Sequence, residues 1–393
     1  MIAFGALSVR RTICGWATVA LAGLVALPTP AQSPGTVIRV GPSRVLQRIS
    51  QAVPLAVDSS VVEIDAGDYV ADVAVWDHAR LTLRGVGGRV RLVAAGASAE
   101  GKAIWVIRRG VITVENIEFV GASVLDRNGA GIRLEGGHLV VRGCRFLDSE
   151  NGILTGNDPA TRLEVENSEF GHLGAGDGFS HGIYVGAIGS FRLSGSYVHH
   201  SKVGHLVKSR ARYNRIEYNR LTDEPGGSAS YELEFPNGGV AEVVGNIVQQ
   251  VADTRNAVIV SYGTEGYTWP RNALSLVHNT VINDEGQGAR FLRVMPGADA
   301  VLLRNNLWVG PGRVDGSSVA DAAGDRRAQG RDLVQPLRGD YRPSGGANAA
   351  WSKVALASVP AALLPRLEYQ HPLATRPLAG VPRWPGALQP AGP

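Results

Sequence analysis

Eight segments of the 393-residue chain repeat one pattern, in which alternating apolar residues lead into an Asn or a Gly. Examples are ITVENIEF around Asn116, LEVENSEF around Asn167 and AEVVGNIV around Asn246. Copies that recur every ~20–35 residues are typical of solenoids, because each unit buries its apolar face only against its neighbours. The alternation has a period of two, which indicates strands, and the Asn or Gly falls where the backbone must turn. The repeat therefore predicts an all-β solenoid.

The Asn or Gly of each copy is expected to occupy the equivalent position in its coil, so that these residues stack along the solenoid. Stacked Asn side chains can then bond from one coil to the next. The Asn and Gly positions of the eight copies are Asn116, Gly143, Asn167, Gly195, Asn219, Asn246, Asn279 and Asn306. We interpret the six Asn residues as an internal ladder and not as part of a ligand site.

A second strand precedes each of these segments, and its alignment carries the functional inference. The residues expected to point inward are Ile132, Ile153, Ile183, Leu206, Leu233 and Ile259. Their neighbours then point outward, in rows ~4.8 Å apart between coils. This alignment places His205 beside Glu232 on one outward row. It places Tyr184, Val207 and Glu234 on the next.

The two ends of the chain differ from the repeat. Residues 1–31 are expected to be an export signal, with Arg10 and Arg11 before an apolar run. After removal of the signal only Cys144 remains, so no internal disulfide is expected. We therefore predict a periplasmic or secreted protein without a membrane span.

The region after the signal is expected to form one β-helix domain, residues 32–310, that is closed at its start. A first strand is predicted at Thr36–Val40, followed by a capping helix that begins at Ser43. The helix would cover the open end of the solenoid. Residues 311–393 hold eleven of the 21 Pro residues and are expected to form an irregular tail on the solenoid, with a short helix near Trp351–Ala357.

Charge is concentrated in the stretch Gly204–Gly239. The whole chain carries a formal charge of only +4, so a local anionic ligand is favoured over nucleic acid. Six cations lie between residues 202 and 220, at and just before the start of this stretch: Lys202, Lys208, Arg210, Arg212, Arg215 and Arg220. The acidic alternation Tyr231-Glu232-Leu233-Glu234-Phe235 follows. His199 and His200, just before it, are interpreted as surface residues.

Glu232 and Glu234 are two residues apart on one strand, which leaves three interpretations open. They could coordinate Ca²⁺, which takes several oxygen ligands. They could be the acid and base of an inverting glycoside hydrolase. They could also be solvated carboxylates neutralised by nearby cations.

The basic residues suggest a different reaction. Cleavage of a uronate polysaccharide by β-elimination requires neutralisation of the sugar carboxylate, a base for the C5 proton and an acid for the C4 oxygen. Lys208 and Arg210 are of the right chemical types and close in sequence. Arginine also binds carboxylates in forked geometry.

The repeat from Thr36 to Gly310 resembles the right-handed parallel β-helix superfamily, the pectate-lyase-like fold. The Lys/Arg cluster with a nearby Glu-x-Glu also resembles the chondroitinase B and alginate lyase family. That resemblance implies Ca²⁺ at Glu232 and Glu234, with base or acid roles for Lys208 and Arg210. In that family the Glu-x-Glu pair precedes the Lys, whereas here it follows.

The sequence thus favours an exported polysaccharide lyase that acts on an acidic polysaccharide as a monomer. Its base would be Lys208, its acid Tyr231 or His205, and Arg210 with Glu-bound Ca²⁺ would neutralise the uronate. Further candidates for substrate binding are His181, Tyr184, Arg212, Asn237, Tyr262 and Glu265. Two alternatives remain open: an inverting glycoside hydrolase that uses Glu232 and Glu234, and a non-catalytic glycan-binding or surface structural protein.

Overall fold

The computed structural model describes Met1 and residues 35–254, 256–286, 289–316, 321–353 and 355–389. The predicted export signal therefore lies outside the described residues, apart from Met1. Within the described ranges, no helix is long and apolar enough to cross a membrane.

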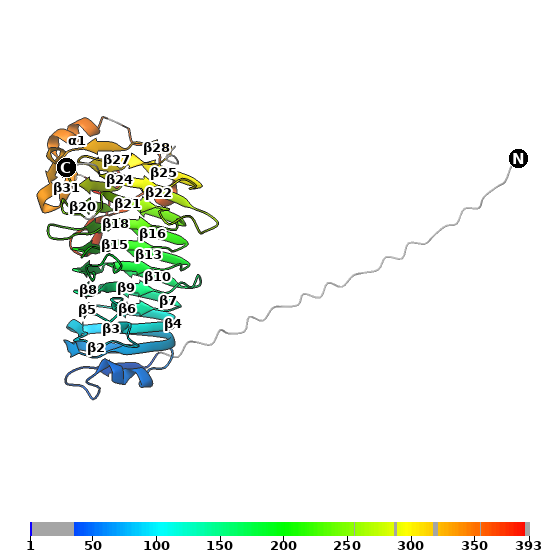
Figure 1. Cartoon of the computed structure of the whole chain (residues 1–393), viewed down its shortest axis with the longest axis vertical. Coiled ribbons are helices and arrows are strands. Elements are labelled where there is room, and N and C mark those ends of the chain that lie inside the picture. The colour runs from blue at the N-terminus through cyan, green and yellow to red at the C-terminus, as the bar shows by residue number, and fades with distance from the viewer. Residues whose placement is uncertain (2–34, 255, 287–288, 317–320, 354, 390–393) are drawn as a thin grey trace, which may run out of the picture. The chain divides into compact units, whose positions relative to one another are not determined.

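From residue 35 onward the chain is a right-handed parallel β-helix, which confirms the predicted fold class. Figure 1 shows the coils stacked from β2 at one end to α1 at the other. Each strand pairs in parallel with the equivalent strand of the next coil. The repeat explains this arrangement, since a strand with alternating apolar residues buries one face inside the coil.

The regular coils have three sides, which we call sheets 1, 2 and 3. Sheet 1 contains β6 (Ala130–Leu134), β9 (Asn151–Thr155), β12 (Ile183–Val185), β15 (His205–Ser209), β18 (Tyr231–Phe235), β21 (Val258–Tyr262), β24 (Arg290–Val294) and β27 (Arg313–Asp315). Sheet 2 contains β7 (His138–Arg142), β10 (Arg162–Glu166), β13 (Ser190–Ser194), β16 (Tyr213–Glu217), β19 (Val240–Val244), β22 (Ala273–Val277), β25 (Ala300–Arg304) and β28 (Asp321–Ala323). Sheet 3 contains β5 (Ile117–Val120), β8 (Arg145–Leu147), β11 (Glu169–Gly171), β14 (Tyr197–His199), β17 (Arg220–Thr222), β20 (Ile247–Gln250), β23 (Thr280–Asn283), β26 (Leu307–Val309) and β29 (Arg326–Ala328).

The first coils are built from longer strands. They are β1 (Val37–Val40), β2 (Ser60–Val70), β3 (Ala74–Val93) and β4 (Ala103–Glu115). The predicted cap is a short 3₁₀-helix, η1 (Ile49–Leu55), and not a helix from Ser43. The carboxylate of Asp72 accepts hydrogen bonds from the first backbone amides of this helix, at Ile49 and Ser50. These bonds fix its start several residues later than the sequence suggested.

The C-terminal region is more regular than predicted. The coils continue past residue 310, because β27, β28 and β29 pair with β24, β25 and β26. Two short 3₁₀-helices, η2 (Gly330–Asp332) and η3 (Pro336–Arg338), flank β30 (Leu333–Gln335), which pairs with β31 (Asp340–Pro343). Then come α1 (Gly345–Trp351), η4 (Ala361–Leu363) and the hairpin of β32 (Leu367–Gln370) and β33 (Ala374–Pro377). The predicted helix near Trp351–Ala357 ends where it was expected to begin.

The Asn ladder is present, but it contains only part of the predicted set. Asn219 donates its side-chain amide to Asn246, at 2.9 Å, and Asn246 donates to Asn279, at 3.0 Å. Asn279 in turn donates to Asn306, at 3.1 Å. In the earlier coils Ser168 and Ser196 take this place, and the backbone amide of Ser196 bonds to Asn219.

Asn116 and Asn167 lie outside the ladder, which corrects the prediction for them. Their φ angles are 57° and 47°, so they make the left-handed turn one residue earlier. Tyr218 and His278 hold this turn position in later coils. The alignment of the repeats placed the turn residue of some coils in one column with the ladder residue of others. Asn suits both a left-handed turn and an amide ladder, so the sequence did not distinguish the two positions.

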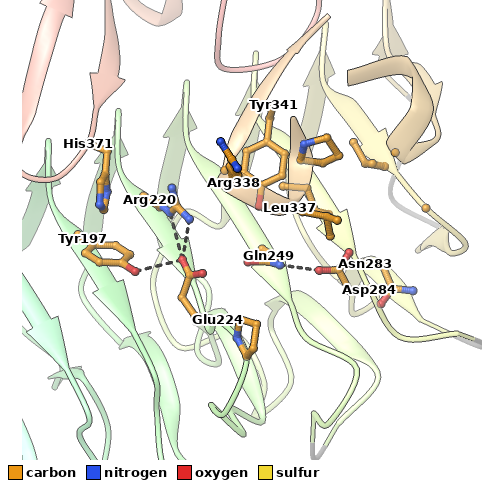
Figure 2. Close-up of a pocket in the computed structure, with 17 residues that line it drawn as sticks. Tyr197, Arg220, Glu224, Gln249, Asn283, Asp284, Leu337, Arg338, Tyr341 and His371 are labelled. Carbon is orange, nitrogen blue, oxygen red and sulfur yellow. Dashed lines mark hydrogen bonds and ion pairs between the residues drawn. The ribbon is translucent and has the colours of Figure 1, made fainter. Parts of the chain in front are cut away.

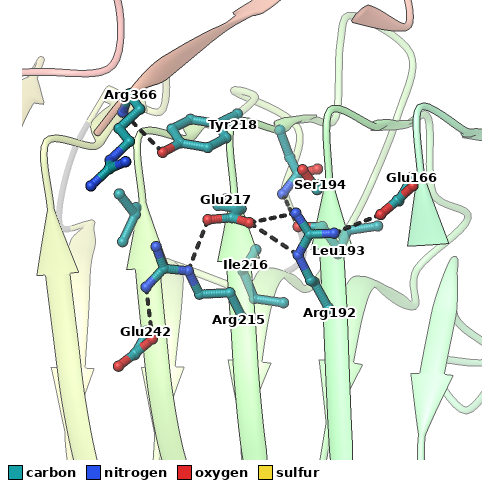
Figure 3. Close-up of polar contacts among 12 residues, drawn as sticks. Glu166, Arg192, Leu193, Ser194, Arg215, Ile216, Glu217, Tyr218, Glu242 and Arg366 are labelled. Atoms are coloured by element: carbon teal, nitrogen blue, oxygen red, sulfur yellow. Dashed lines mark hydrogen bonds and ion pairs between the residues drawn. The ribbon is translucent and has the colours of Figure 1, made fainter. Parts of the chain in front are cut away.

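Charged side chains on the outer face of sheet 2 neutralise one another (Figure 3). Arg192 bridges Glu166, at 2.6 Å, and Glu217, at 2.8 Å. Arg215 bridges the same Glu217, at 2.8 Å, and Glu242, at 2.7 Å. Arg215, part of the basic stretch singled out in the sequence, is therefore a structural residue of sheet 2.

Candidate functional site

The outer face of sheet 1 brings together most of the predicted site residues. Tyr184 pairs with Lys208, and Lys208 pairs with Glu234 in the next coil. Inward-facing Ile183 aligns with Val207 and not with Leu206. The predicted outward row of Tyr184, Val207 and Glu234 was therefore wrong by one residue in the middle coil. Lys208 takes the outward position.

Glu232 lies inside the coil, which contradicts its predicted place beside His205. It precedes Leu233 in the strand, is fully buried, and has no hydrogen-bond partner for either carboxylate oxygen among the described residues. Burial raises the pKa of Glu232 well above its usual 4.5, and the negative charge of Asp223 adds to this. The pKa of Asp223 is itself raised by burial, to about 6. Glu232 is thus a fully buried residue and cannot act on a substrate outside the coil.

We predict that Glu232→Leu stabilises the protein. A buried polar group without a hydrogen-bond partner costs about 1–3 kcal/mol. The folded-state pKa is raised, so the protein loses stability relative to the leucine variant as pH rises above 4.5, the usual pKa. Urea unfolding at several pH values measures this. The control Glu164→Leu, on the outer side of sheet 2, should change the free energy of unfolding by less than about 0.5 kcal/mol, and a destabilised Glu232→Leu protein would contradict the prediction.

Lys208 lies between two carboxylates. Its Nζ is 3.3 Å from Oε2 of Glu234 and 3.1 Å from Oε1 of Glu265. Burial acts to raise the pKa of Glu234, but His205, Lys208 and the hydroxyl of Thr264 together hold it at about 2. The Nζ of Lys208 is thus engaged by two carboxylates from different parts of the chain.

Arg210 holds the carboxylate of Glu265 with two nitrogens. The distances are 2.6 Å from Nη1 to Oε2 and 3.0 Å from Nη2 to Oε1. Arg210 is oriented by Tyr184, whose hydroxyl accepts from Nε at 3.1 Å, and by the side-chain oxygen of Asn237. The Arg210 side chain is 19% exposed and that of Glu265 is 44% exposed. The site is thus a fork of donors on the outer face, occupied by a carboxylate of the chain itself.

Three aromatic rings lie at or just before the start of the sheet 1 strands β12, β15 and β18. The rings of His181 and His205 lie 4.5 Å apart, and His205 meets Tyr231 edge-on at 4.8 Å. The backbone amide of His205 donates to Nδ1 of His181, at 3.0 Å, so the proton of neutral His181 is on Nε2. Burial lowers the pKa of both imidazoles below 6.5, although Glu234 opposes this at His205. Both rings are therefore neutral near pH 7.

One ring nitrogen of His205 lies beside a carboxylate. Its Nδ1 is 3.2 Å from Oε2 of Glu234, and its side chain is 7% exposed. A carboxylate at this distance favours the tautomer with the proton on Nδ1. The lone pair is then on Nε2, which has no partner among the described residues.

The three remaining predicted residues have different surroundings. Tyr262 is fully buried and donates its hydroxyl to the carbonyl of Gly239 at 2.6 Å, so its predicted role in substrate binding was wrong. Arg212 is exposed and packs over the ring of Tyr213, at 5.2 Å, away from the carboxylate fork. Asn237 belongs to the fork.

Two residues of the site were missed in the sequence. Thr264 donates its hydroxyl to Oε1 of Glu234, at 2.8 Å. Trp269 donates its indole N–H to the carbonyl of Arg210, at 3.0 Å. Both lie in the long connection between β21 and β22. No local motif distinguishes them.

The site does not fit Ca²⁺ as the resemblance implied. Ca²⁺ takes six to eight oxygen ligands. Of the predicted pair, Glu232 points into the interior, and Glu234 already contacts Lys208, His205 and Thr264. A cation at Glu234 would also lie beside the ammonium group of Lys208.

A separate hollow of about 530 Å³ lies between sheet 3 and the C-terminal segment (Figure 2). Two of its charged side chains pair with each other: Glu224 accepts from Arg220, at 2.7 Å, and also from the hydroxyl of Tyr197, at 3.1 Å. Gln249 donates to Asp284, at 2.5 Å. Arg220, another cation of the basic stretch, thus supports the contact with the C-terminal segment.

Comparison with known proteins supports the fold. No family model matches the chain, and no curated protein is significantly similar in sequence. Among solved structures, the pectate lyase Pel9A matches with a TM-score of 0.53 and 14% identity. The match covers 91% of this chain and 97% of that one. The chain therefore has the fold of this pectate lyase, a right-handed parallel β-helix.

Proposed function

We propose that the protein is a carbohydrate-active enzyme that cleaves a uronate-containing polysaccharide by β-elimination at the outer face of sheet 1. The observation that carries this is the fork of Arg210 and Lys208 around the carboxylate of Glu265. A uronate carboxylate has the same shape and charge, so it can take the place of Glu265. Forked arginine contacts recognise planar carboxylates selectively.

Carboxylate binding is the first requirement of the reaction. Arg210 and Lys208 would neutralise the uronate carboxylate and so acidify the C5 proton. A base takes that proton, the electrons of the C5–H bond form the C4–C5 double bond, and the C4–O bond breaks. The leaving oxygen receives a proton from an acid. The products are an unsaturated uronate end and a new hydroxyl end.

We assign the base to His205 in place of Lys208. The imidazole of His205 is neutral and lies beside the carboxylate of Glu234, whereas the Nζ of Lys208 is already engaged in ion pairs with two carboxylates. Tyr231, whose ring contacts that of His205, is the proposed acid. Its partly exposed side chain lies at the start of the same strand face.

The direct test is a panel of uronate and neutral polysaccharides with two assays on each sample. Ultraviolet absorbance detects the unsaturated uronate, and a reducing-end assay detects any chain cleavage. Elimination gives both signals on uronate substrates, and hydrolysis gives reducing ends alone. Saturable binding without either signal would identify a glycan-binding protein and overturn the proposal.

We predict that Glu265→Gln lowers KM without lowering kcat. Glu265 competes with the substrate carboxylate for Arg210, and an exposed ion pair contributes about 0.5–1 kcal/mol, so KM should fall about two- to fivefold. Steady-state kinetics on the active substrate measures this. Glu242→Gln, which removes a comparable partner of Arg215 on sheet 2, is the matched control. A higher KM in Glu265→Gln would show that Glu265 positions Arg210 and does not compete with substrate.

A further inference from the structure

Three histidines gather at the edge of sheet 3, away from the residues assigned to elimination. His199 ends β14, His200 follows it, and His172 follows β11 one coil earlier. Gly171 pairs with His199, so the stacking of coils brings His172 close to His200. One nitrogen from each ring lies within 4.8 Å of the others. The sequence suggested surface residues, but His199 is only 7% exposed.

His199 is oriented in the way that metal-bound histidines are. Its Nε2 lies 3.3 Å from Oε1 of Glu169, and its Nδ1 lies 2.6 Å from Nδ1 of His200. Arg145 pairs with the same carboxylate, with Nη2 at 2.6 Å from Oε2 of Glu169. An ionised carboxylate on the far nitrogen fixes the tautomer that leaves Nδ1 as a lone pair.

His200 lies against both of the other rings. Its Nδ1 faces Nδ1 of His199, and its ring centre lies 4.6 Å from that of His172. The three imidazoles therefore present their nitrogens to one small region at the edge of sheet 3.

We propose that His172, His199 and His200 form a binding site for a divalent transition-metal ion of the Zn²⁺ class. Imidazole nitrogen suits Zn²⁺, Cu²⁺ and Ni²⁺, whereas Ca²⁺ requires oxygen ligands. Three histidines fill three of the four positions of a tetrahedral ion and leave one for water or a ligand.

The geometry needs only a small adjustment. Zn–N bonds of about 2.0–2.1 Å place two ligand nitrogens roughly 3.4 Å apart in a tetrahedral site. The nitrogens of His199 and His200, now 2.6 Å apart, must separate slightly. The exposed His172 has room to rotate toward them.

The test is metal binding by the full-length protein after chelation of bound metal. Zn²⁺ is titrated calorimetrically, and Co²⁺ is followed by visible absorption, which is intense for tetrahedral coordination. We expect one ion per chain and a strong Co²⁺ spectrum. The double variant H172A/H200A should lose at least about a hundredfold in affinity, and Glu169→Gln about 10–100-fold. His138→Ala, whose ring pairs with Glu164 at 2.9 Å on sheet 2, should bind as the unmodified protein does.

Two results would overturn the proposal. One is the absence of Zn²⁺ and Co²⁺ binding, which would mean that a shared proton bridges His199 and His200. The other is unchanged affinity in H172A/H200A, with circular dichroism showing a folded β-helix. The single variant His172→Ala changes only an exposed side chain and keeps the test valid if the double variant does not fold.

Discussion

His205→Gln is expected to reduce kcat for uronate elimination by about 10²–10⁴-fold, the usual contribution of general base catalysis. Glutamine keeps the size and polarity of the side chain but cannot accept the C5 proton. The effect should fall on kcat and leave KM nearly unchanged, because His205 does not hold the carboxylate. His138→Gln is the matched control. Full activity in His205→Gln would contradict the assignment of the base.

The pH dependence of kcat/KM tests the same assignment of the base, and its direction is expected from the pKa of His205. Burial lowers the pKa of His205 below 6.5, so the active neutral form already predominates at that pH. The unmodified enzyme should be on a plateau above pH 6.5 and lose kcat/KM as the pH falls through the lowered pKa. A rise that begins only in the range where lysine titrates would instead favour Lys208.

Substitutions of Lys208 test whether this residue binds the substrate carboxylate or acts as the base. If Lys208 supplies charge to the carboxylate, Lys208→Arg should keep a substantial part of the activity and Lys208→Ala should mainly raise KM. If Lys208 is the base, both variants should lose kcat alike.

Asn246→Ala is expected to destabilise the fold by about 3 kcal/mol or more. The side-chain oxygen of Asn246 accepts from the backbone and side-chain amides of Asn219, at 3.0 and 2.9 Å. Its amide donates to the carbonyl of Ile216, at 2.8 Å, and to Asn279, at 3.0 Å. Alanine leaves these buried groups unpaired, at about 1–3 kcal/mol for each. Urea unfolding, with the exposed Asn128→Ala as control, measures the loss.

A milder substitution distinguishes the loss of the ladder hydrogen bonds from the loss of side-chain volume. Ser196 occupies the equivalent place in an earlier coil, where its hydroxyl accepts a backbone amide. Asn246→Ser should therefore lose less stability than Asn246→Ala. Equal losses in the two variants would show that the hydrogen bonds of the ladder contribute little.

The repeat was sufficient to predict the coil but not the register of every strand. Leu206 and Val207 are both apolar and both buried, so the pattern did not show which of them aligns with Ile183. A shift of one residue exchanges the inner and outer faces of a strand. That shift brought Lys208 outward, whereas Leu233 kept its predicted inward place and Glu232 beside it is buried as well.

Contacts between segments that are far apart in the chain also could not be predicted from the sequence. Glu265 and Arg210 are 55 residues apart in the chain and meet only because a connection after β21 returns to the face of sheet 1. The last coil, β27 to β29, follows residues rich in Pro and Gly and lacks the repeat pattern. The preceding coil, β24 to β26, pairs with it through backbone hydrogen bonds, which most side chains permit.

The central claim is that Arg210 and its neighbours bind and eliminate a uronate. The most direct measurement is ultraviolet absorbance of the product from uronate polysaccharides treated with the unmodified protein, His205→Gln and Arg210→Ala. We predict an unsaturated uronate with the unmodified protein and almost none with either variant. Equal product from all three proteins, or reducing ends without absorbance, would contradict the account.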